Sequence, residues 1–284
     1  MKASELPLAP DGSLYHIRLT SSTLADKVLL VGDPDRVDMF KQVFDSVEFE
    51  SRNREIHALT GTYHGTAMTA LSTGMGCDNI DIVMTELDAA LRVDCGKWEE
   101  RCDRHLQIVR IGTSGSLQPD IDCGSPVASR YAIGLDGLMN YYKEWDTPEP
   151  SMEQALDTHL CLDDRLAHPY CVKGSEMLLD KIAFDMHHGI TATAPGFYGP
   201  QGRTVRLHPS IDNLNEELAS FSYDGTPVTN LEMETSAIFG FSHLLGHEAL
   251  TICLIIANRP NGTFLNDYHP QMRSLVGTVV ERLA

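Results

Sequence analysis

The stretch VLLVGDPDRVDMF, residues 28–40, leads from apolar residues through a polar turn into a helical pattern. The first four residues form a short apolar run that is typical of a buried strand. Asp33 suits a helix N-cap, and Pro34 suits the first helical position, where its missing N–H is not needed. Apolar residues then recur at helical spacing: Val37, Phe40, Phe44 and Val47. The stretch therefore predicts a strand, a glycine turn and a helix with Arg36 on its first turn.

The position of Arg36 points to an anion. A cation on the first turn faces the positive end of the helix dipole, where a carboxylate would be more favourable. A bound phosphate would resolve this conflict, because turns between a strand and a helix present N–H groups to anions. The alternative is an ion pair between Arg36 and Asp35 or Asp38.

Composition limits the classes of partner. The chain has 284 residues, 42% of them hydrophobic, which is enough for a substantial core. It carries 40 acidic and 22 basic residues, a net charge of −18. This charge repels nucleic acid and anionic membranes, so neither is an expected partner. An anionic ligand would have to be captured by a local cluster of arginines.

The cysteines indicate a reducing compartment. There are seven of them, an odd number, and no C-x-x-C pair. This pattern argues against a disulfide framework and a structural zinc site. The longest apolar run, residues 250–257, is too short to cross a bilayer. We therefore expect a cytoplasmic protein with reduced thiols.

Strand-like and helix-like segments alternate along the chain. Strands are predicted at 67–71, 106–112, 189–195 and 248–259, and helices after the STGMG turn and near 174–187, 234–246 and 270–283. This rhythm predicts an α/β fold with a mixed, mostly parallel sheet, helices on both faces and ligands at the carboxyl ends of strands. We expect a single domain over 1–284, in which 134–170 is an irregular surface excursion.

Three predicted strands end in glycine turns: VGDPDR, LSTGMG and RIGTSGS. Together they suggest one ligand-binding edge. The first is not a dinucleotide fingerprint, because Pro34 and Val37 stand where that motif has glycines. The third approaches the G-x-S-x-G elbow of hydrolases, but Ser116 replaces the last glycine and no triad follows, which argues against a serine hydrolase.

Arg110 interrupts an apolar strand. A buried guanidinium requires an anionic partner, because its desolvation costs several kcal/mol. A phosphate held by two hydrogen bonds is one such partner, and Thr113 with the following N–H groups would complete its cradle. A core ion pair with an acidic residue is the alternative.

Two further patterns bear on metals and sugars. His243 and His247 have the i, i+4 spacing of zinc ligands, but a third ligand is missing, so packed or surface histidines are expected. In NLEMETSA, residues 230–237, Glu234 could accept hydrogen bonds from sugar hydroxyls. An acidic helix start is the alternative.

Five motifs in order resemble the nucleoside phosphorylase-I family of purine and uridine phosphorylases: GDPDRV, RIGTSGSLQPDI, FYGPQGR, NLEMETSA and ALTICLIIANR. The resemblance extends over most of the chain from about His16 and is weakest over 134–175. It implies a three-layer α/β/α fold and a homo-oligomer whose sites are shared between subunits.

The resemblance also implies roles for individual residues. The implied phosphate ligands are Gly32, Arg36, Arg110 and Thr113, with Arg54 from a neighbouring subunit. The implied ribose contacts are Met233, Glu234 and the neighbour's His16. The implied base contacts are Phe197, Gln201 and Arg203. Glu55 matches a residue that binds potassium in some members.

The implied reaction is phosphorolysis of uridine to uracil and ribose 1-phosphate, with Arg36, Arg110, Gln201 and Arg203 as the catalytic groups. The transition state combines a cationic sugar with an anionic leaving base, so cations near phosphate and donors near the base act where charge develops. Phosphate is the co-substrate, and no cofactor is expected.

One departure from the family pattern favours a pyrimidine. Purine-specific relatives carry an aspartate at the end of the strand that matches residues 251–259, whereas Ile256, Ala257 and Asn258 stand here. Without that acid, purine cleavage should lose the factor of about 10²–10⁴ that acid catalysis supplies. A nucleosidase or a purine phosphorylase of the same fold and a non-catalytic nucleoside-binding protein remain alternatives.

Overall fold

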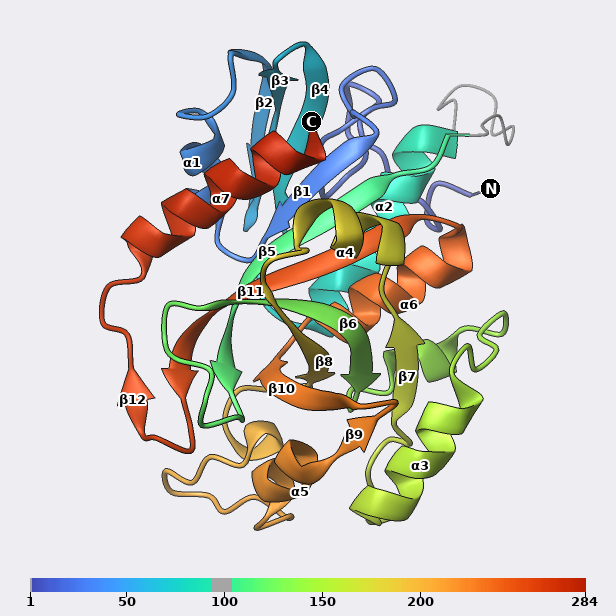
Figure 1. Ribbon diagram of the computed structural model, residues 1–284. Helices are drawn as coiled ribbons and strands as arrows, with labels where there is room; N and C mark the ends of the chain where they lie inside the picture. Colours follow the sequence, from blue (N-terminus) through green and yellow to red (C-terminus); the bar gives the residue numbers. More distant parts are fainter. Residues whose placement is uncertain (1, 93–103) are drawn as a thin grey trace.

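A twelve-stranded sheet organises the chain in a computed structural model that describes residues 2–92 and 104–284. Helices and short 3₁₀ turns alternate with its strands (Figure 1). The elements are β1 (Lys27–Val31), α1 (Pro34–Phe40), β2 (Ser46–Asn53), β3 (Ile56–Tyr63), β4 (Thr66–Ser72), α2 (Cys77–Arg92), β5 (Gln107–Ser116), β6 (Pro126–Gly134), η1 (Leu138–Tyr141), α3 (Pro150–Leu160), β7 (Tyr170–Lys173), α4 (Glu176–Ile182), β8 (His187–Thr193), η2 (Gly199–Gln201), α5 (Leu214–Ser220), β9 (Ser222–Tyr223), β10 (Thr226–Glu232), α6 (Thr235–Leu245), β11 (Glu248–Asn258), β12 (Thr263–Phe264) and α7 (His269–Leu283).

Five strands of the sheet close into a ring. The strand order is β12-β11-β6-β8-β10-β5-β1-β4-β3-β2, and β11 also pairs with β5. The strands β5, β11, β6, β8 and β10 are therefore joined in a circle, from which β1, β4, β3 and β2 extend on one side. Register shifts in β6, β10 and β11 accompany this closure, because bulges bend strands and increase their twist.

Helices cover both faces of the extended part of the sheet. Along β1, Leu29 and Val31 pack in one core cluster with residues of α1, α4 and α7. Val28 and Leu30 pack in another cluster with residues of α2 and α6. This alternation follows from the two-residue period of a strand. In Figure 1, α4 and α7 lie in front of the strands, and α2 and α6 lie behind them.

A third core cluster lies under the ring, between its strands and the helices α3 and α5 (Figure 1). Met152 and Leu156 of α3 are fully buried in this cluster. The expectation that 134–170 is an irregular surface excursion is therefore wrong, because α3 contributes to the core. The sequence pattern did not reveal α3, because its buried apolar residues Met152, Leu156 and Leu160 are few and stand among polar and acidic residues.

The strand–turn–helix prediction for residues 28–40 is confirmed. The Asp33 carboxylate accepts a hydrogen bond from the Asp35 N–H at 2.9 Å, and Pro34 occupies the first helical position. The helix ends earlier than the apolar spacing suggested: α1 stops at Phe40, and Val47 lies in β2 with 44% of its surface exposed.

Three other expectations need correction. The sheet is mixed but not mostly parallel, since five of its twelve described pairings are parallel: β1–β4, β1–β5, β5–β11, β6–β8 and β8–β10. RIGTSGS is not a turn, because β5 continues to Ser116. The helix expected over 174–187 is α4, which ends at Ile182, and His187 begins β8.

Two remaining points concern helices and cysteines. Within residues 2–92 and 104–284, none of the helices has the length and apolar character needed to span a membrane. Cys77, Cys123, Cys161, Cys171 and Cys253 are free thiols. Cys95 and Cys102 lie outside the described residues.

Candidate active site

A cavity of about 690 Å³ opens where the β1–α1 turn, β5, the η2 loop and the β10–α6 junction meet. These segments are far apart in the sequence. The expected potassium ligand Glu55 lines this cavity, and so do nine of the expected phosphate, ribose and base contacts: Gly32, Arg36, Arg110, Thr113, Phe197, Gln201, Arg203, Met233 and Glu234. The fold therefore brings the predicted phosphate, ribose and base contacts into one enclosure.

Arg36 reaches the cavity without a carboxylate partner among the described residues. It is 8% exposed, its Nη1 donates to the Ile111 carbonyl at 3.4 Å, and its Nε has no hydrogen-bond partner there. Burial lowers the pKa of Arg36, and the nearby Arg110 charge adds to this effect. Asp38 pairs instead with Lys41 and Arg52. The ion pair considered as an alternative for Arg36 is therefore absent from this part of the chain.

Arg110 is buried against two carboxylates. Its Nη1 lies 3.0 Å from Glu232 Oε2, and its Nη2 is hydrogen-bonded to Glu234. Burial alone would lower the pKa of Arg110, but Glu232 and Glu234 outweigh it and raise that pKa. The guanidinium thus has the core ion pair that the sequence left as an alternative, and it still lines the cavity.

Gly112 makes room for the Arg110 guanidinium. The two residues lie on the same face of β5, two positions apart. A Cβ added at Gly112 would stand 2.3 Å from Arg110 Nη1. Only glycine therefore fits beside the guanidinium as it is placed.

Glu234 connects three elements of the site. Its Oε1 accepts a hydrogen bond from the Gly76 N–H at 2.7 Å, on the turn before α2, while its Oε2 contacts Arg110. Burial raises the pKa of the Glu234 carboxyl, against the opposing charge of Arg110. Gly76 has a φ of +94°, which favours glycine and aims this N–H at the carboxylate.

Glu232, to which the sequence analysis gave no role, holds Arg110 and the start of α6 at the same part of the cavity. It accepts hydrogen bonds from the backbone N–H groups of Glu234 and Thr235 at 3.0–3.1 Å and from the Thr193 hydroxyl at 2.6 Å. It therefore caps the start of α6 while it holds Arg110. Its sequence signal was its place two residues before Glu234, at the end of a strand.

The side-chain amide of Gln201 joins two arginines in the part of the site expected to bind the nucleobase. The Gln201 Oε1 accepts hydrogen bonds from Arg203 Nη1 at 2.6 Å and from Arg259 Nη2 at 2.7 Å. The Arg203 guanidinium also lies 3.9 Å from the centre of the Phe197 ring. Burial lowers the pKa of Arg203, and burial together with the Arg203 charge lowers the pKa of Arg259 to about 10.

Arg259 is the second functional candidate that the sequence reasoning missed. It ends the quoted motif ALTICLIIANR, but no role was given to it. Its signal was an arginine at the carboxyl end of a buried strand. Arg259 does not line the cavity, but through Gln201 Oε1 it adds a second positive charge beside Arg203, which does line it.

Ser114 is not a nucleophile on a turn. It lies inside β5, and its hydroxyl accepts a hydrogen bond from Asn230 at 2.9 Å. Asn230 in turn accepts from Thr191, which contacts Ser129. These buried polar groups lie on four of the five ring strands and satisfy one another, which supports the argument against a serine hydrolase.

His16 and Arg54 do not line the main cavity. They lie on a small neighbouring pocket that also includes Asn53 and Glu55. The His16 ring is 2.5 Å from the Glu86 carboxylate, and Arg54 sits at the β2–β3 turn with a left-handed φ of 55°. The small pocket shares Glu55 and Asn79 with the lining of the main cavity.

His243 and His247 do not form the pair of helical metal ligands that their spacing suggested. Gly246 ends α6, so His247 lies beyond the helix that carries His243, and the two share no helical face. The cluster of three potential ligands among the described residues is Asp38, Glu50 and His57, which does not include Glu55.

The end of β11 carries no acid at the cavity. Ile256 and Ala257 line it. Asn258 instead donates both of its amide hydrogens within the fold, to the carbonyls of Gln118 and Ile121 at 2.9 Å each. The polar side chain among these three residues therefore has a structural role.

Comparison with known proteins gives a consistent result. The model of the Phosphorylase superfamily matches residues 26–282. The uridine phosphorylase of Thermococcus kodakarensis is 28% identical over 265 residues, which cover 92% of this chain and 83% of that one. A DeoD-type purine nucleoside phosphorylase of Streptococcus suis is 27% identical over 242 residues, which cover 84% of each chain.

Among solved structures, a nucleoside phosphorylase of Trypanosoma brucei, described as showing uridine phosphorylase activity, superposes with a TM-score of 0.89. It is 32% identical, and the match covers 98% of this chain and 99% of that one. The likeness therefore includes the whole fold and not only the quoted motifs.

Proposed function

Since this chain belongs to the phosphorylase superfamily, we propose that it is a pentosyltransferase that cleaves uridine with phosphate to give uracil and ribose 1-phosphate. The observation that carries this proposal is the single cavity in which Arg36, Arg110, Gln201 and Arg203 meet. Relatives that bear the name uridine phosphorylase support it.

In the proposed reaction, phosphate binds at the β1–α1 turn beside Gly32, Arg36, Arg110 and Thr113. Arg36 brings a charge that no described carboxylate neutralises, while Glu232 and Glu234 hold Arg110 in place. The phosphate oxygen attacks the anomeric carbon as the bond to the base breaks. Positive charge that builds on the sugar is then close to the anionic nucleophile.

The ribose is proposed to bind beside Met233 and Glu234. A carboxylate accepts hydrogen bonds from vicinal hydroxyls, and Glu234 is oriented for this by Gly76 and Arg110. When a ribose binds, its hydroxyls would share the carboxylate that Arg110 now contacts.

The base is proposed to bind near Phe197, with its polar edge at Gln201 and Arg203. An amide pairs with both an acceptor and a donor, as the O4 and N3–H of uracil require. Arg203, with Arg259 behind it, supplies donors to an oxygen that gains charge as the base leaves. The absence of an acid among Ile256, Ala257 and Asn258 favours a pyrimidine over a purine.

We further propose a three-layer α/β/α description of residues 1–284 as one domain, and an oligomer with shared sites. The placement of His16 and Arg54 outside their own cavity supports sharing. Glu55 lines the main cavity and remains a candidate potassium ligand. A cytoplasmic location is supported by the free thiols of the described cysteines.

One assay separates the alternatives. Ultraviolet measurement of uridine, thymidine and inosine cleavage, each with and without phosphate, reports both the base and the nucleophile. The proposal expects phosphate-dependent cleavage of uridine. Cleavage without phosphate would identify a nucleosidase, efficient inosine cleavage a purine enzyme, and binding without turnover a nucleoside-binding protein.

A further inference from the structure

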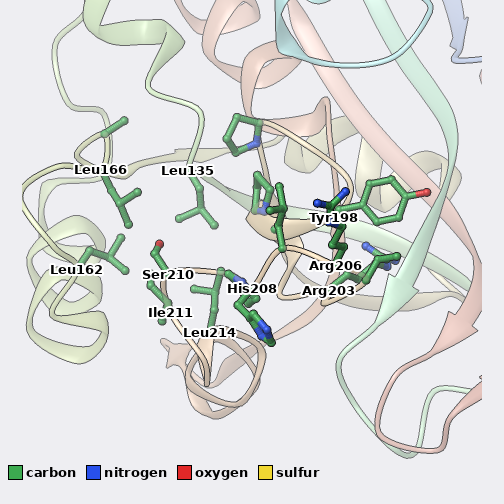
Figure 2. Close-up of a pocket in the computed structure, with 17 residues that line it drawn as sticks. Leu135, Leu162, Leu166, Tyr198, Arg203, Arg206, His208, Ser210, Ile211 and Leu214 are labelled. Carbon is green, nitrogen blue, oxygen red and sulfur yellow. The ribbon is translucent and has the colours of Figure 1, made fainter.

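A second cavity, of about 960 Å³, adjoins the candidate active site (Figure 2). It lies between the segment after α3 and the loop that follows η2. Arg203 is the one lining residue that the two cavities have in common among the described residues. The proposed reaction uses none of the other residues of this second cavity.

The two ends of this cavity differ in chemistry. Leucines and an isoleucine surround one end, where Figure 2 shows Leu135, Leu162, Leu166, Ile211 and Leu214. This end offers apolar surface to a ligand, and burial of such surface is favourable.

The opposite end is cationic. Figure 2 places Arg203 and Arg206 together there beside Tyr198. Neither arginine forms an ion pair with a carboxylate of the described residues. No aspartate or glutamate from residues 2–92 or 104–284 lines the cavity, although the whole chain contains 40. Arginines without acidic partners, next to an apolar surface, favour a ligand that carries its own negative charge.

We propose that this cavity binds an amphipathic carboxylate, with its apolar body among the leucines and its charged head at Arg206 and Arg203. Most ligand pockets of this size combine apolar walls with a few convergent polar groups. A neutral molecule of the same shape would leave the arginines without a partner, and it should bind more weakly.

A carboxylate bound in this cavity should also affect the candidate active site. Arg203 Nη1 donates to Gln201 Oε1 at 2.6 Å, and a carboxylate at Arg203 would compete with this amide for the guanidinium. Gln201 would then lose one of the two arginine contacts that orient it. The cavity would thus act as an effector site; this second half of the inference rests on the proposed function, whereas binding itself does not.

The test measures binding of octanoate and octanamide to the full chain by calorimetry, in the presence of saturating phosphate. These probes share one apolar tail and differ in charge. We expect octanoate to bind more tightly than octanamide. Equal affinities, no binding of octanoate, or binding only without phosphate, as for an anion in the phosphate site, would each overturn the proposal.

Variants place the ligand in the cavity. Arg206→Gln removes the charge but keeps a polar side chain, and it should weaken octanoate binding about tenfold, the loss expected for one charge-assisted hydrogen bond. Leu166→Glu puts a carboxylate at the apolar end and should weaken it as well. Arg165→Gln is the matched control, since Arg165 is an exposed neighbour that pairs with Asp163 outside the lining. Unchanged octanoate affinity in both test variants would refute the assignment.

Steady-state kinetics test the coupling between this cavity and the active site. Octanoate should raise the KM for uridine and leave the KM for phosphate unchanged, and Arg206→Gln should keep the basal kcat while it loses this effect. Octanoate binding with no effect on uridine turnover would overturn the coupling through Arg203. If uridine is not a substrate at all, the proposed function fails, and the calorimetric result still decides the binding.

Discussion

Replacing Arg110 with alanine should weaken the fold and the reaction together. Arg110 is 3% exposed, and its guanidinium contacts both Glu232 and Glu234, which are 4% and 6% exposed. Removing one partner from a buried ion pair leaves uncompensated charge, and this destabilises proteins by about 3–5 kcal/mol. The loss should fall at the upper end of this range, because two carboxylates lose their partner.

The size of the deficit should depend on pH. Burial already raises the pKa of Glu234, and Arg110 opposes this shift. In the variant the opposing charge is gone, so the pKa of Glu234 in the folded state rises further above its unfolded value. A group with a raised folded pKa stabilises the protein at low pH and loses this contribution as pH rises through that pKa. The variant should therefore lie closer to the unmodified protein near pH 5 than near pH 8.

Urea unfolding at several pH values measures the free energy of unfolding, and phosphorolysis of uridine is followed on the same samples. Activity should fall by about 10²-fold or more, the loss typical of removing a group that stabilises transition-state charge. Arg165→Ala, at an exposed arginine with its own carboxylate, should leave both measurements unchanged. A deficit below about 1 kcal/mol that is the same at every pH would show that Arg110 does not compensate these carboxylates.

Three other changes test separate parts of the site. Arg36→Ala should raise the KM for phosphate about tenfold, as for a lost charge-assisted contact, with a smaller effect on uridine; equal effects on both substrates in initial-rate kinetics would contradict a phosphate role. Gln201→Leu should lower kcat/KM for uridine by about 2–5 kcal/mol of transition-state binding and keep the phosphate dependence, and a variant indistinguishable on uridine would show that the base is read elsewhere. Gly112→Ala places a Cβ 2.3 Å from Arg110 Nη1, so it should displace the guanidinium and lower both kcat/KM and the unfolding midpoint; normal values for both would show that Arg110 has another position of equal energy.

Much of the local structure follows from the sequence alone. The apolar run before Gly32, the Asp33 cap and Pro34 predict β1 and the start of α1, because these signals act between residues close in the chain. The apolar periodicity of residues 80–91 likewise predicts the core face of α2. The five motifs carry the residues that the family resemblance assigns to phosphate, ribose and base, and nine of these residues line one cavity.

The sequence predicted the ends of helices and strands less well. Val47 continues the helical spacing of Phe40 and Phe44, yet it lies in β2, because pairing with β3 outweighs a weak local preference. RIGTSGS is rich in glycine and looks like a turn, but β11 pairs with β5 through Ser116 and keeps it extended. Glycine only permits a turn, and the neighbouring strand decides whether one forms.

Only the tertiary structure decided which anionic groups pair with Arg110 and which side chains contact Gln201. The sequence showed that a buried arginine needs an anion, but both a ligand and a core carboxylate satisfy that requirement. The closure of β5, β11, β6, β8 and β10 into a ring brings Glu232 and Glu234 to Arg110, and Arg259 to Gln201. Such contacts join residues that are about 60 to 120 positions apart, and no local pattern encodes them, because they depend on which strands pair and in which register.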